Sequence, residues 1–324
     1  GGRAAAEAVP AVGIIANPYS GKDIRRLVAY GATVDNLSKV RILQRVLVGL
    51  REAGVRLVRY MPDPFALLPA AYEGLRPADR EGMVLEPVLA EIAGEAADTV
   101  QAAVRMVALG TRVIITLGGD GTNRLVASVA GSVPLMPLST GTNNAFPTWV
   151  EPTIAGLAAG RVALGAAEGL RREKRLRVEV GGRAEVALVD VALLRGDHTG
   201  AGAIWEPERL RELVATQGLP HAIGLSAVVG QVCPLDRSEP GAVHVVFGPG
   251  SAVRAPIAPG RFETLSVAAH RRVDFGAAVE LGPGPGVVAV DGERLLTVPP
   301  GVRPVVRVAP DGPVVIDPVA VLAR

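Results

Sequence analysis

Residues 116–123 read TLGGDGTN, and they follow the short apolar run RVII at 112–115. The turn places three glycines around one aspartate, where a buried strand is expected to end. Because glycine lacks a Cβ, it can adopt positive φ angles and let backbone N–H groups approach a ligand closely. The residues after the turn are expected to start a helix, whose first N–H groups favour an anion such as phosphate.

Asp120 is unexpected beside phosphate, because its carboxylate repels one. It makes sense if Mg²⁺ bridges the two groups, or if Asp120 accepts a proton from an attacking hydroxyl in phosphoryl transfer. A tight turn in which the aspartate caps the helix explains the loop equally well. From this stretch alone, the functional and the structural interpretations are about equally favoured.

A second loop, STGTNNAF at 139–146, also follows a predicted strand. It is dense in small hydroxyl and amide groups, which can bind phosphate oxygens, ribose hydroxyls or an adenine edge. Such clusters usually form only loops. Open α/β sheets, however, bind ligands at the carboxyl ends of their strands, and both loops are expected there.

The order of the predicted elements favours an α/β domain followed by a β-rich one. Strands and helices alternate up to about residue 148, which is typical of a doubly wound, Rossmann-like parallel sheet. Strands are expected at 11–16, 55–60, 112–117 and 134–138, and helices at 35–54, 96–109, 123–129 and 153–167. Beyond, short β-rich runs predict an antiparallel domain. These runs are 177–180, 184–194, 242–247, 263–269, 287–290 and 303–308, with one helix expected at 207–216.

We therefore expect a nucleotide-binding domain at 1–148, a β-rich substrate domain at 149–302, and a C-terminal segment at 303–324 that returns to the first domain. The 324 residues carry a formal net charge of +2, so no nucleic-acid partner is indicated. We expect a cytoplasmic protein without a membrane partner, because there is a single cysteine, no signal peptide is recognisable and no apolar run could span a bilayer.

Two common nucleotide-binding motifs do not fit. Residues 17–23, NPYSGKD, resemble a P-loop, but Ala16 stands where the first glycine belongs and Asp23 replaces the Ser or Thr that would hold Mg²⁺. The dinucleotide fingerprint of three spaced glycines is also absent after the first strand.

The glycine loops resemble those of the superfamily that joins ATP-NAD kinases with diacylglycerol and sphingosine kinases. GGDGT at 118–122 is similar to its signature, 139–146 to its second nucleotide loop, and NPYSG at 17–21 to its N-terminal loop. The resemblance covers nearly the whole chain in the right order. GTNN, APIAPG at 255–260 and DGER at 291–294 are most similar to the acetoin-catabolism X-protein branch of the ATP-NAD kinase-like family.

The resemblance implies a kinase that uses ATP and Mg²⁺ to phosphorylate an alcohol group of a small molecule. It implies Asp120 as the base or metal-organising carboxylate and Glu293 as a second base or hydroxyl-orienting group. It assigns no metal ligands beyond that. The implied nucleotide ligands are Asn17, Ser20, Gly21, Gly118, Gly119, Gly121, Thr122, Asn123, Thr140, Gly141, Thr142, Asn143 and Asn144. Similarity to NAD kinases also suggests a homo-oligomer with an interface on the β-rich domain.

The acceptor is left open by two departures from NAD kinases. Val189 stands where their asparagine contacts the dinucleotide, and Asp-Gly-Glu at 291–293 replaces their usual Asp-Gly-Gln. Asp190 and Asp291 are the candidate acceptor ligands, although Asp-Gly is also a strong hairpin-turn signal. NAD, a polyol or another metabolite remain as acceptors, and a lipid kinase or a non-catalytic nucleotide-binding regulator remain as alternative functions.

Overall fold

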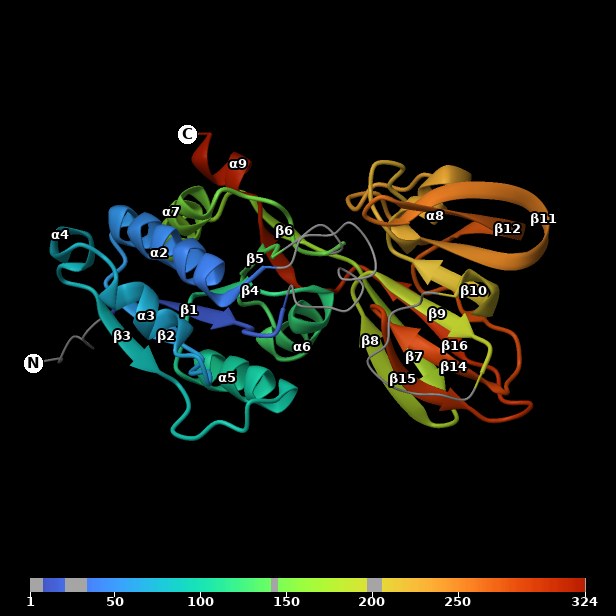
Figure 1. Ribbon diagram of the computed structural model, residues 1–324, viewed down its shortest axis with the longest axis horizontal. Helices are drawn as coiled ribbons and strands as arrows, with labels where there is room; N and C mark the ends of the chain where they lie inside the picture. Colours follow the sequence, from blue (N-terminus) through green and yellow to red (C-terminus); the bar gives the residue numbers. More distant parts are fainter. Residues whose placement is uncertain (1–7, 21–33, 141–144, 197–205, 324) are drawn as a thin grey trace, which may run out of the picture.

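The computed structural model describes residues 8–20, 34–140, 145–196 and 206–323. They form two parts that lie side by side along the longest axis, an α/β part next to the N-terminus and a β-rich part (Figure 1). The last helix returns to the α/β part, so the chain crosses between the parts in both directions. This arrangement confirms the predicted fold class.

The α/β part is built on a sheet whose described strands lie in the order β3-β2-β1-β4-β5-β17-β6. Neighbouring strands are parallel except β6, which runs antiparallel to β17. The strands are β1 (Ala11–Ala16), β2 (Leu57–Tyr60), β3 (Val84–Pro87), β4 (Val113–Leu117), β5 (Leu135–Leu138), β6 (Leu170–Arg172) and β17 (Val314–Ile316).

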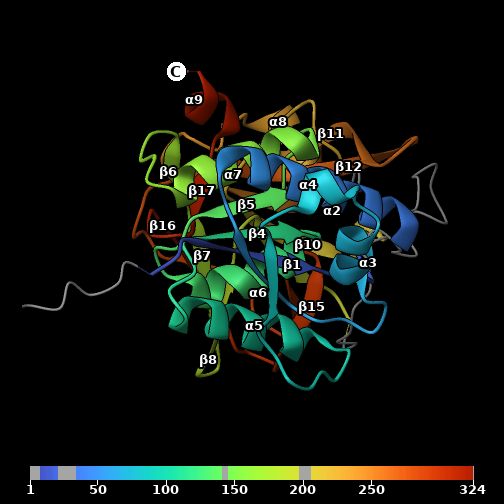
Figure 2. The ribbon, with the colours of Figure 1, turned by 90° about the vertical axis from the view of Figure 1, so that its left-hand side faces the viewer.

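Helices cover both faces of this sheet, as Figure 2 shows. Ile14 packs with Leu47 in the cluster under α2 and α7, whereas its neighbour Ile15 packs with Met106 in the cluster under α5 and α6. Successive side chains of a strand point to opposite faces, so a strand buried on both faces is apolar throughout. The helices are α2 (Asn36–Ala53), α3 (Leu67–Glu73), α4 (Pro77–Arg80), α5 (Ala96–Ala108), α6 (Asp120–Ala130), α7 (Pro152–Ala163) and α9 (Pro318–Leu322).

The β-rich part contains two antiparallel sheets, with described strands in the orders β12-β11-β10-β9-β14-β15 and β13-β16-β7-β8. Val178 and Val306 of the smaller sheet pack against Leu193 and Val288 of the larger one. The strands are β7 (Arg175–Val180), β8 (Arg183–Ala187), β9 (Asp190–Leu194), β10 (Leu210–Ala215), β11 (Ala242–Ala258), β12 (Arg261–Val273), β13 (Val279–Glu280), β14 (Gly286–Val290), β15 (Glu293–Val298) and β16 (Val305–Ala309). Helix α8 (Leu225–Val232) covers the other face of the larger sheet.

The C-terminal segment is divided between the two parts. Strand β16 pairs with β7 in the β-rich part, and only the residues after it return to the first sheet. There Val315 pairs with Leu135 of β5 on one side and with Arg171 of β6 on the other. Helix α9 then packs on α7, and Val321 of α9 belongs to the core cluster that contains Ile14 and Leu47.

The helix predicted at 207–216 is wrong. The structure has one 3₁₀ turn, η1 (Pro207–Arg209), followed by strand β10 between β9 and β11. A β-bulge between Leu210 and Glu212 adds one residue, so Leu210 and Leu213 face the same core. Their spacing of three residues is the spacing of one face of a helix, although the segment is a strand.

The apolar run predicted as one strand at 184–194 is also wrong, because it forms two strands in different sheets. Strand β8 ends at Ala187 and β9 begins at Asp190. The break between them wraps around the side chain of Asp291. The helix predicted at 123–129 begins three residues earlier, at Asp120, and ends at Ala130.

Candidate active site

The glycine turn and the N-terminal loop meet at the carboxyl edge of the first sheet. The Asn17 backbone N–H donates to the Leu117 carbonyl at 2.9 Å, and the Asn17 side-chain amide donates to the Thr122 hydroxyl at 3.1 Å. Ser20 bonds back to the Asn17 carbonyl at 2.9 Å. Strands β1 and β4 are neighbours, so the parallel sheet brings these loops together although they lie about a hundred residues apart.

The glycines of the turn allow a close approach. A Cβ on Gly118 would collide with the Thr122 side chain at 2.6 Å, and a Cβ on Gly121 would meet the Glu293 carboxylate at 2.5 Å. Gly119 is the N-cap of α6 and has no side chain to cap the first N–H groups. The start of α6 therefore offers an anion the backbone donors that a capping side chain would otherwise occupy.

Asn123 was predicted among the nucleotide ligands, and its position contradicts this. Its side chain is completely buried. It donates to the Gly119 carbonyl at 2.9 Å and accepts from the Thr116 hydroxyl at 2.7 Å. Asn123 therefore braces the turn from inside.

Asp120 is the first residue of α6, but its carboxylate does not cap that helix. Instead it accepts the backbone N–H groups of Ala145, at 3.1 Å, and Phe146, at 2.8 Å. Asp120 thus fastens the end of the second glycine loop to the first. Of the predicted ligands in these loops, Thr140 is buried, whereas Gly21, Gly141, Thr142, Asn143 and Asn144 lie outside the described residues.

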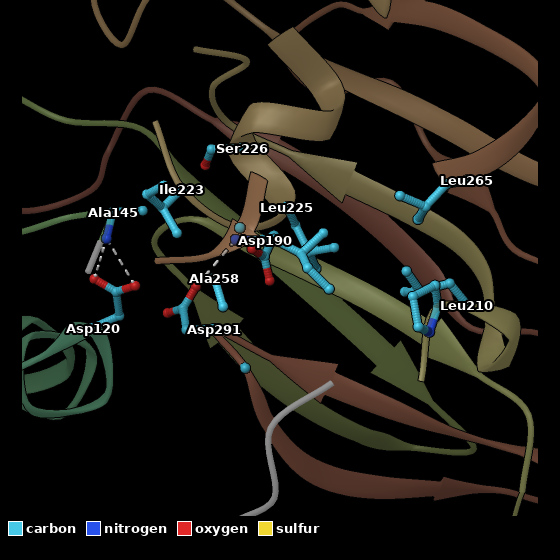
Figure 3. A pocket seen from close by; sticks show the side chains of 14 residues that line it. Asp120, Ala145, Asp190, Leu210, Ile223, Leu225, Ser226, Ala258, Leu265 and Asp291 are labelled. Carbon is cyan, nitrogen blue, oxygen red and sulfur yellow. Dashed lines mark hydrogen bonds between the residues drawn. The ribbon is translucent and has the colours of Figure 1, made fainter. Parts of the chain in front are cut away.

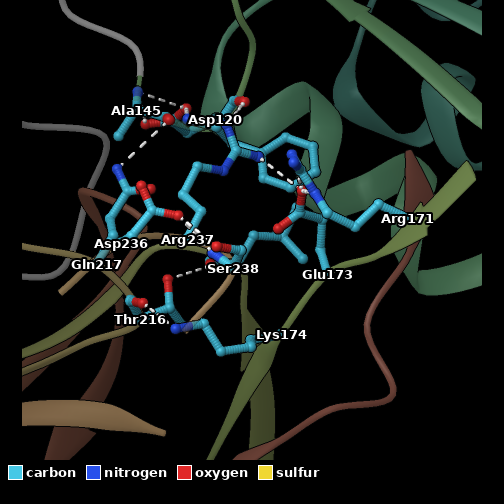
Figure 4. A network of polar contacts seen from close by, with 12 residues as sticks. Asp120, Ala145, Arg171, Glu173, Lys174, Thr216, Gln217, Asp236, Arg237 and Ser238 are labelled. Carbon is cyan, nitrogen blue, oxygen red and sulfur yellow. Dashed lines mark hydrogen bonds and ion pairs between the residues drawn. The ribbon is translucent and has the colours of Figure 1, made fainter. Parts of the chain in front are cut away.

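The β-rich part holds the carbonyl side of the same loop (Figure 4). Arg237 donates to the Phe146 carbonyl at 2.8 Å and lies over the Phe146 ring, 5.0 Å from its centre. Its guanidinium is 3.4 Å from the buried carboxylate of Glu173, and burial lowers the pKa of Arg237. The amide of Gln217 reaches the Ala145 carbonyl at 3.5 Å. Sequence reasoning missed Arg237, because no motif marks it.

Asp291 occupies the hairpin turn between β14 and β15. Asp291 and Gly292 have φ angles of 49° and 83°, the positive values of a two-residue hairpin turn. The buried Asp291 carboxylate accepts the N–H groups of Leu188, Val189 and Asp190 at 2.8 to 3.1 Å. Its pKa is raised from 3.8 to about 7, mainly because burial disfavours its charged form and further because of the Asp120 charge. Asp291 therefore belongs to the hairpin turn through its backbone, and its carboxylate binds the segment between β8 and β9.

Glu293 follows that turn and faces the first part of the molecule. Its carboxylate accepts from the Arg124 guanidinium of α6 at 2.7 Å, and 40% of its side chain is exposed. Arg124 also lies 4.0 Å from Glu185. The Arg124–Glu293 pair therefore joins helix α6 to the β-rich part beside the glycine turn.

Two cavities adjoin the start of α6. The interdomain cavity (Figure 3) lies between the two parts and is lined by Asp120, Ala145, Asp190, Pro207, Leu210, Ile223, Gly224, Leu225, Ser226, Ile257, Ala258, Leu265, Asp291 and Gly292. The edge cavity lies at the carboxyl edge of the first sheet and includes Asn17, Pro18, Asp63, Thr99, Gly121, Thr122 and Glu293. Asp120 therefore faces one cavity, and the next two residues of its helix face the other.

Lys39 supports the edge cavity, and sequence reasoning missed it. It is a completely buried residue of α2, and its ammonium donates to the carbonyls of Pro18 at 2.8 Å and Asn17 at 3.2 Å. The available signal was its place four residues before Leu43, in line with the apolar face of the helix. A lysine on such a face needs polar partners inside the protein.

No group of three or more His, Cys, Asp or Glu side chains within the described ranges could hold a metal ion by itself. Mg²⁺ usually takes only one or two carboxylates, together with phosphate oxygens and water. Asp120 lines the interdomain cavity and Glu293 lines the edge cavity, so either could supply one such carboxylate. Among the helices of the described segments, none has both the length and the apolar character to cross a membrane.

Comparison with known proteins agrees with this division into two parts. The ATP-NAD kinase N-terminal domain matches residues 12–165, and the acetoin catabolism protein X C-terminal domain matches residues 174–311. Acetoin catabolism protein X of Cupriavidus necator is 38% identical over 312 residues, which cover 92% of this chain and 87% of that protein. The chain belongs to the acetoin catabolism protein X family. The resemblance found in the glycine loops is thereby confirmed.

A solved structure shares the fold of this chain. Yeast NADH kinase complexed with NADH matches with a TM-score of 0.52, over 96% of this chain and 84% of the kinase chain. Its sequence is 14% identical, so the likeness concerns the fold alone. The match to the ATP-NAD kinase N-terminal domain and the match to this structure therefore agree on an NAD kinase-like fold.

Proposed function

We propose that this protein is a phosphotransferase that moves the terminal phosphoryl group of ATP to a hydroxyl of a small molecule. The observation that carries the proposal is the position of the first turn of α6 between the two cavities. Asp120 lines the interdomain cavity, whereas Gly121 and Thr122 line the edge cavity. Donor and acceptor can therefore meet at one helix N-terminus.

The edge cavity suits the phosphates of the donor. Backbone N–H groups at the start of α6 and the helix dipole both favour negative charge. The Asn17 amide and the Thr122 hydroxyl are within 3.1 Å of each other at this edge, which adds polar groups for phosphate oxygens. Mg²⁺, held by phosphate oxygens near Asp120 or Glu293, would neutralise negative charge on the transferring group.

The interdomain cavity suits the acceptor. The acceptor hydroxyl oxygen forms a bond to the terminal phosphorus of ATP, the bond from that phosphorus to the bridging oxygen breaks, and ADP leaves. The hydroxyl proton passes to the Asp120 carboxylate. That carboxylate is held in one orientation by the N–H groups of Ala145 and Phe146. A base positioned in this way contributes to rate only if the hydroxyl lies within hydrogen-bond reach.

The test is ADP release from ATP and Mg²⁺ in the presence of candidate acceptors, NAD among them. Asp120→Asn should lower acceptor-dependent release by about 100-fold or more, because the base is lost while the shape of the side chain is kept. Asp274→Asn is the matched control, since Asp274 is exposed on the β-rich part away from both cavities. Equal turnover by the Asp120→Asn variant and the wild type would refute the role of Asp120.

A further inference from the structure

The two ends of the interdomain cavity differ in chemistry. Asp120, Asp190 and Asp291 gather at the end next to α6 (Figure 3). The opposite end is apolar and is formed by Leu210 and Leu265, with Leu225 between the two ends. A ligand that fills the cavity must therefore place polar hydrogens near the carboxylates and carbon atoms near the leucines.

The charged side chains that line the interdomain cavity are all aspartates among the residues that the structure describes. None of its described lining residues is Arg, Lys or His. Arg237 is close enough to interact with the Asp120 charge, but its guanidinium is directed to the Phe146 carbonyl and Glu173.

A phosphorylated acceptor is therefore disfavoured. Its phosphate would lie in the same cavity as three aspartates, and like charges repel strongly at short range where little water screens them. Uncharged hydroxyl groups instead donate hydrogen bonds to carboxylates. Ser226 adds a hydroxyl to the lining, which accepts from Gln217 at 3.2 Å and can donate to an uncharged ligand oxygen.

We propose that the acceptor is an uncharged aliphatic alcohol, with at least one hydroxyl at the carboxylate end and an alkyl segment at the leucine end. The inference rests on the proposed function for the reaction and on the cavity for the class of acceptor. The hydroxyl oxygen forms the new bond to phosphorus, its proton passes to Asp120, and ADP is the leaving group. The product is a phosphate monoester whose new charge favours its departure from this cavity.

Matched acceptor pairs test the charge and the alkyl requirement separately. Glycerol and glycerol 3-phosphate differ by one phosphate, and in 1,2-hexanediol a butyl chain replaces one hydroxymethyl group of glycerol. We expect the wild type to show kcat/KM at least about tenfold higher for glycerol than for glycerol 3-phosphate. We expect a further increase for the hexanediol, because its alkyl chain is buried against leucines. Higher kcat/KM for NAD or glycerol 3-phosphate than for every uncharged alcohol would overturn the inference and leave the proposed function standing.

Two variants assign these preferences to the two ends. Asp190→Asn should narrow the difference between glycerol and glycerol 3-phosphate, because the carboxylate of Asp190 is replaced by an uncharged amide. Leu225→Asn should remove the advantage of 1,2-hexanediol over glycerol while leaving the phosphate discrimination in place. Leu225 is only half-buried, so this change should not unfold the protein. Unchanged preferences in both correctly folded variants would overturn the assignment of the two ends.

Direct binding separates failure of the inference from failure of the proposed function. Saturation-transfer NMR of 1,2-hexanediol requires no turnover. Binding that Leu225→Asn weakens, without ADP release from any acceptor, would support the ligand class and refute the kinase. No binding and no turnover with any uncharged alcohol would overturn the inference. Dioctanoylglycerol tests whether the acceptor is a free alcohol or a lipid. If dioctanoylglycerol reacts faster than the free diols, the uncharged alcohol is part of a lipid.

Discussion

At the scale of single residues, Asp291 ties stability to pH. Its pKa rises from 3.8 to about 7 on folding, chiefly through burial. Between these values the folded state binds more protons than the unfolded chain, so the free energy of unfolding falls as pH rises. The stability that protonated Asp291 contributes is fully present below pH 3.8 and is lost as the pH rises through about 7. It amounts to on the order of 4 kcal/mol.

Asp291→Asn cannot titrate and should lack this dependence. We expect its free energy of unfolding, measured in urea at steps between about pH 4.5 and 8, to fall less steeply than that of the wild type. Asp274→Asn serves as the control, because that side chain is exposed in the folded state as in the unfolded chain. Parallel curves for the wild type and Asp291→Asn would contradict the raised pKa.

The residues that could be predicted from the sequence differ from those that could not in whether their partners lie near them in the chain. Asp120 and Asp291 stand next to glycines in turns, and the sequence displays such turns directly. Arg237 and Lys39 bind backbone carbonyls that are distant in sequence, and only the fold brings those carbonyls near. Asn123 was misassigned because a buried amide that braces a turn and an exposed amide that binds a ligand look alike in a sequence.

At the scale of elements, α2 and α7 pack through glycine. A Cβ on Gly156 would collide with the Val46 carbonyl of α2, and one on Gly49 would collide with the Thr153 carbonyl of α7. Gly156→Ala should therefore destabilise the protein by about 2 kcal/mol, although alanine favours helix more than glycine does. Urea denaturation measures the change. Ile154→Ala, at a partly exposed site on the same helix, is the control and should cost clearly less.

Helix α2 and strand β10 show which elements the sequence pattern can predict. Helix α2 has a capping aspartate before it and a glycine after it: Asp35 accepts the Ser38 N–H, and Gly54 ends the helix with a φ of 106°. The error at β10 arose because a bulge changes the spacing of apolar residues, and a bulge depends on pairing with distant strands. A sequence pattern therefore predicts a helix whose ends are fixed by neighbouring residues, but not a bulge that is fixed by pairing with distant strands.

At the scale of the whole molecule, Lys174 secures the crossing from the α/β part into the β-rich part. Its ammonium donates to the carbonyls of Thr216, Glu239 and Gly241 at 2.6 to 3.0 Å. Lys174→Met should cost on the order of 3 kcal/mol, because these carbonyls lose their donor in a buried place. Arg175→Met removes only a half-exposed ion pair with Asp311, and about 1 kcal/mol or less is expected. Equal midpoints of the two variants in urea denaturation would count against this role.

Arg237 is the contact through which the β-rich part holds the loop that binds Asp120 of the α/β part. It fixes the Phe146 carbonyl, and the N–H of the same residue binds Asp120. Arg237→Gln should therefore lower kcat by about tenfold or more, since small displacements of a catalytic group reduce rates strongly. Nucleotide affinity, measured by calorimetry, should change less, because the edge cavity does not include Arg237. Arg272→Gln, at an exposed arginine bonded to Glu239 of the same loop, is the control. A loss of nucleotide affinity as large as the loss of kcat would show that Arg237 serves the fold of both cavities, and full activity would show that Asp120 is held without it.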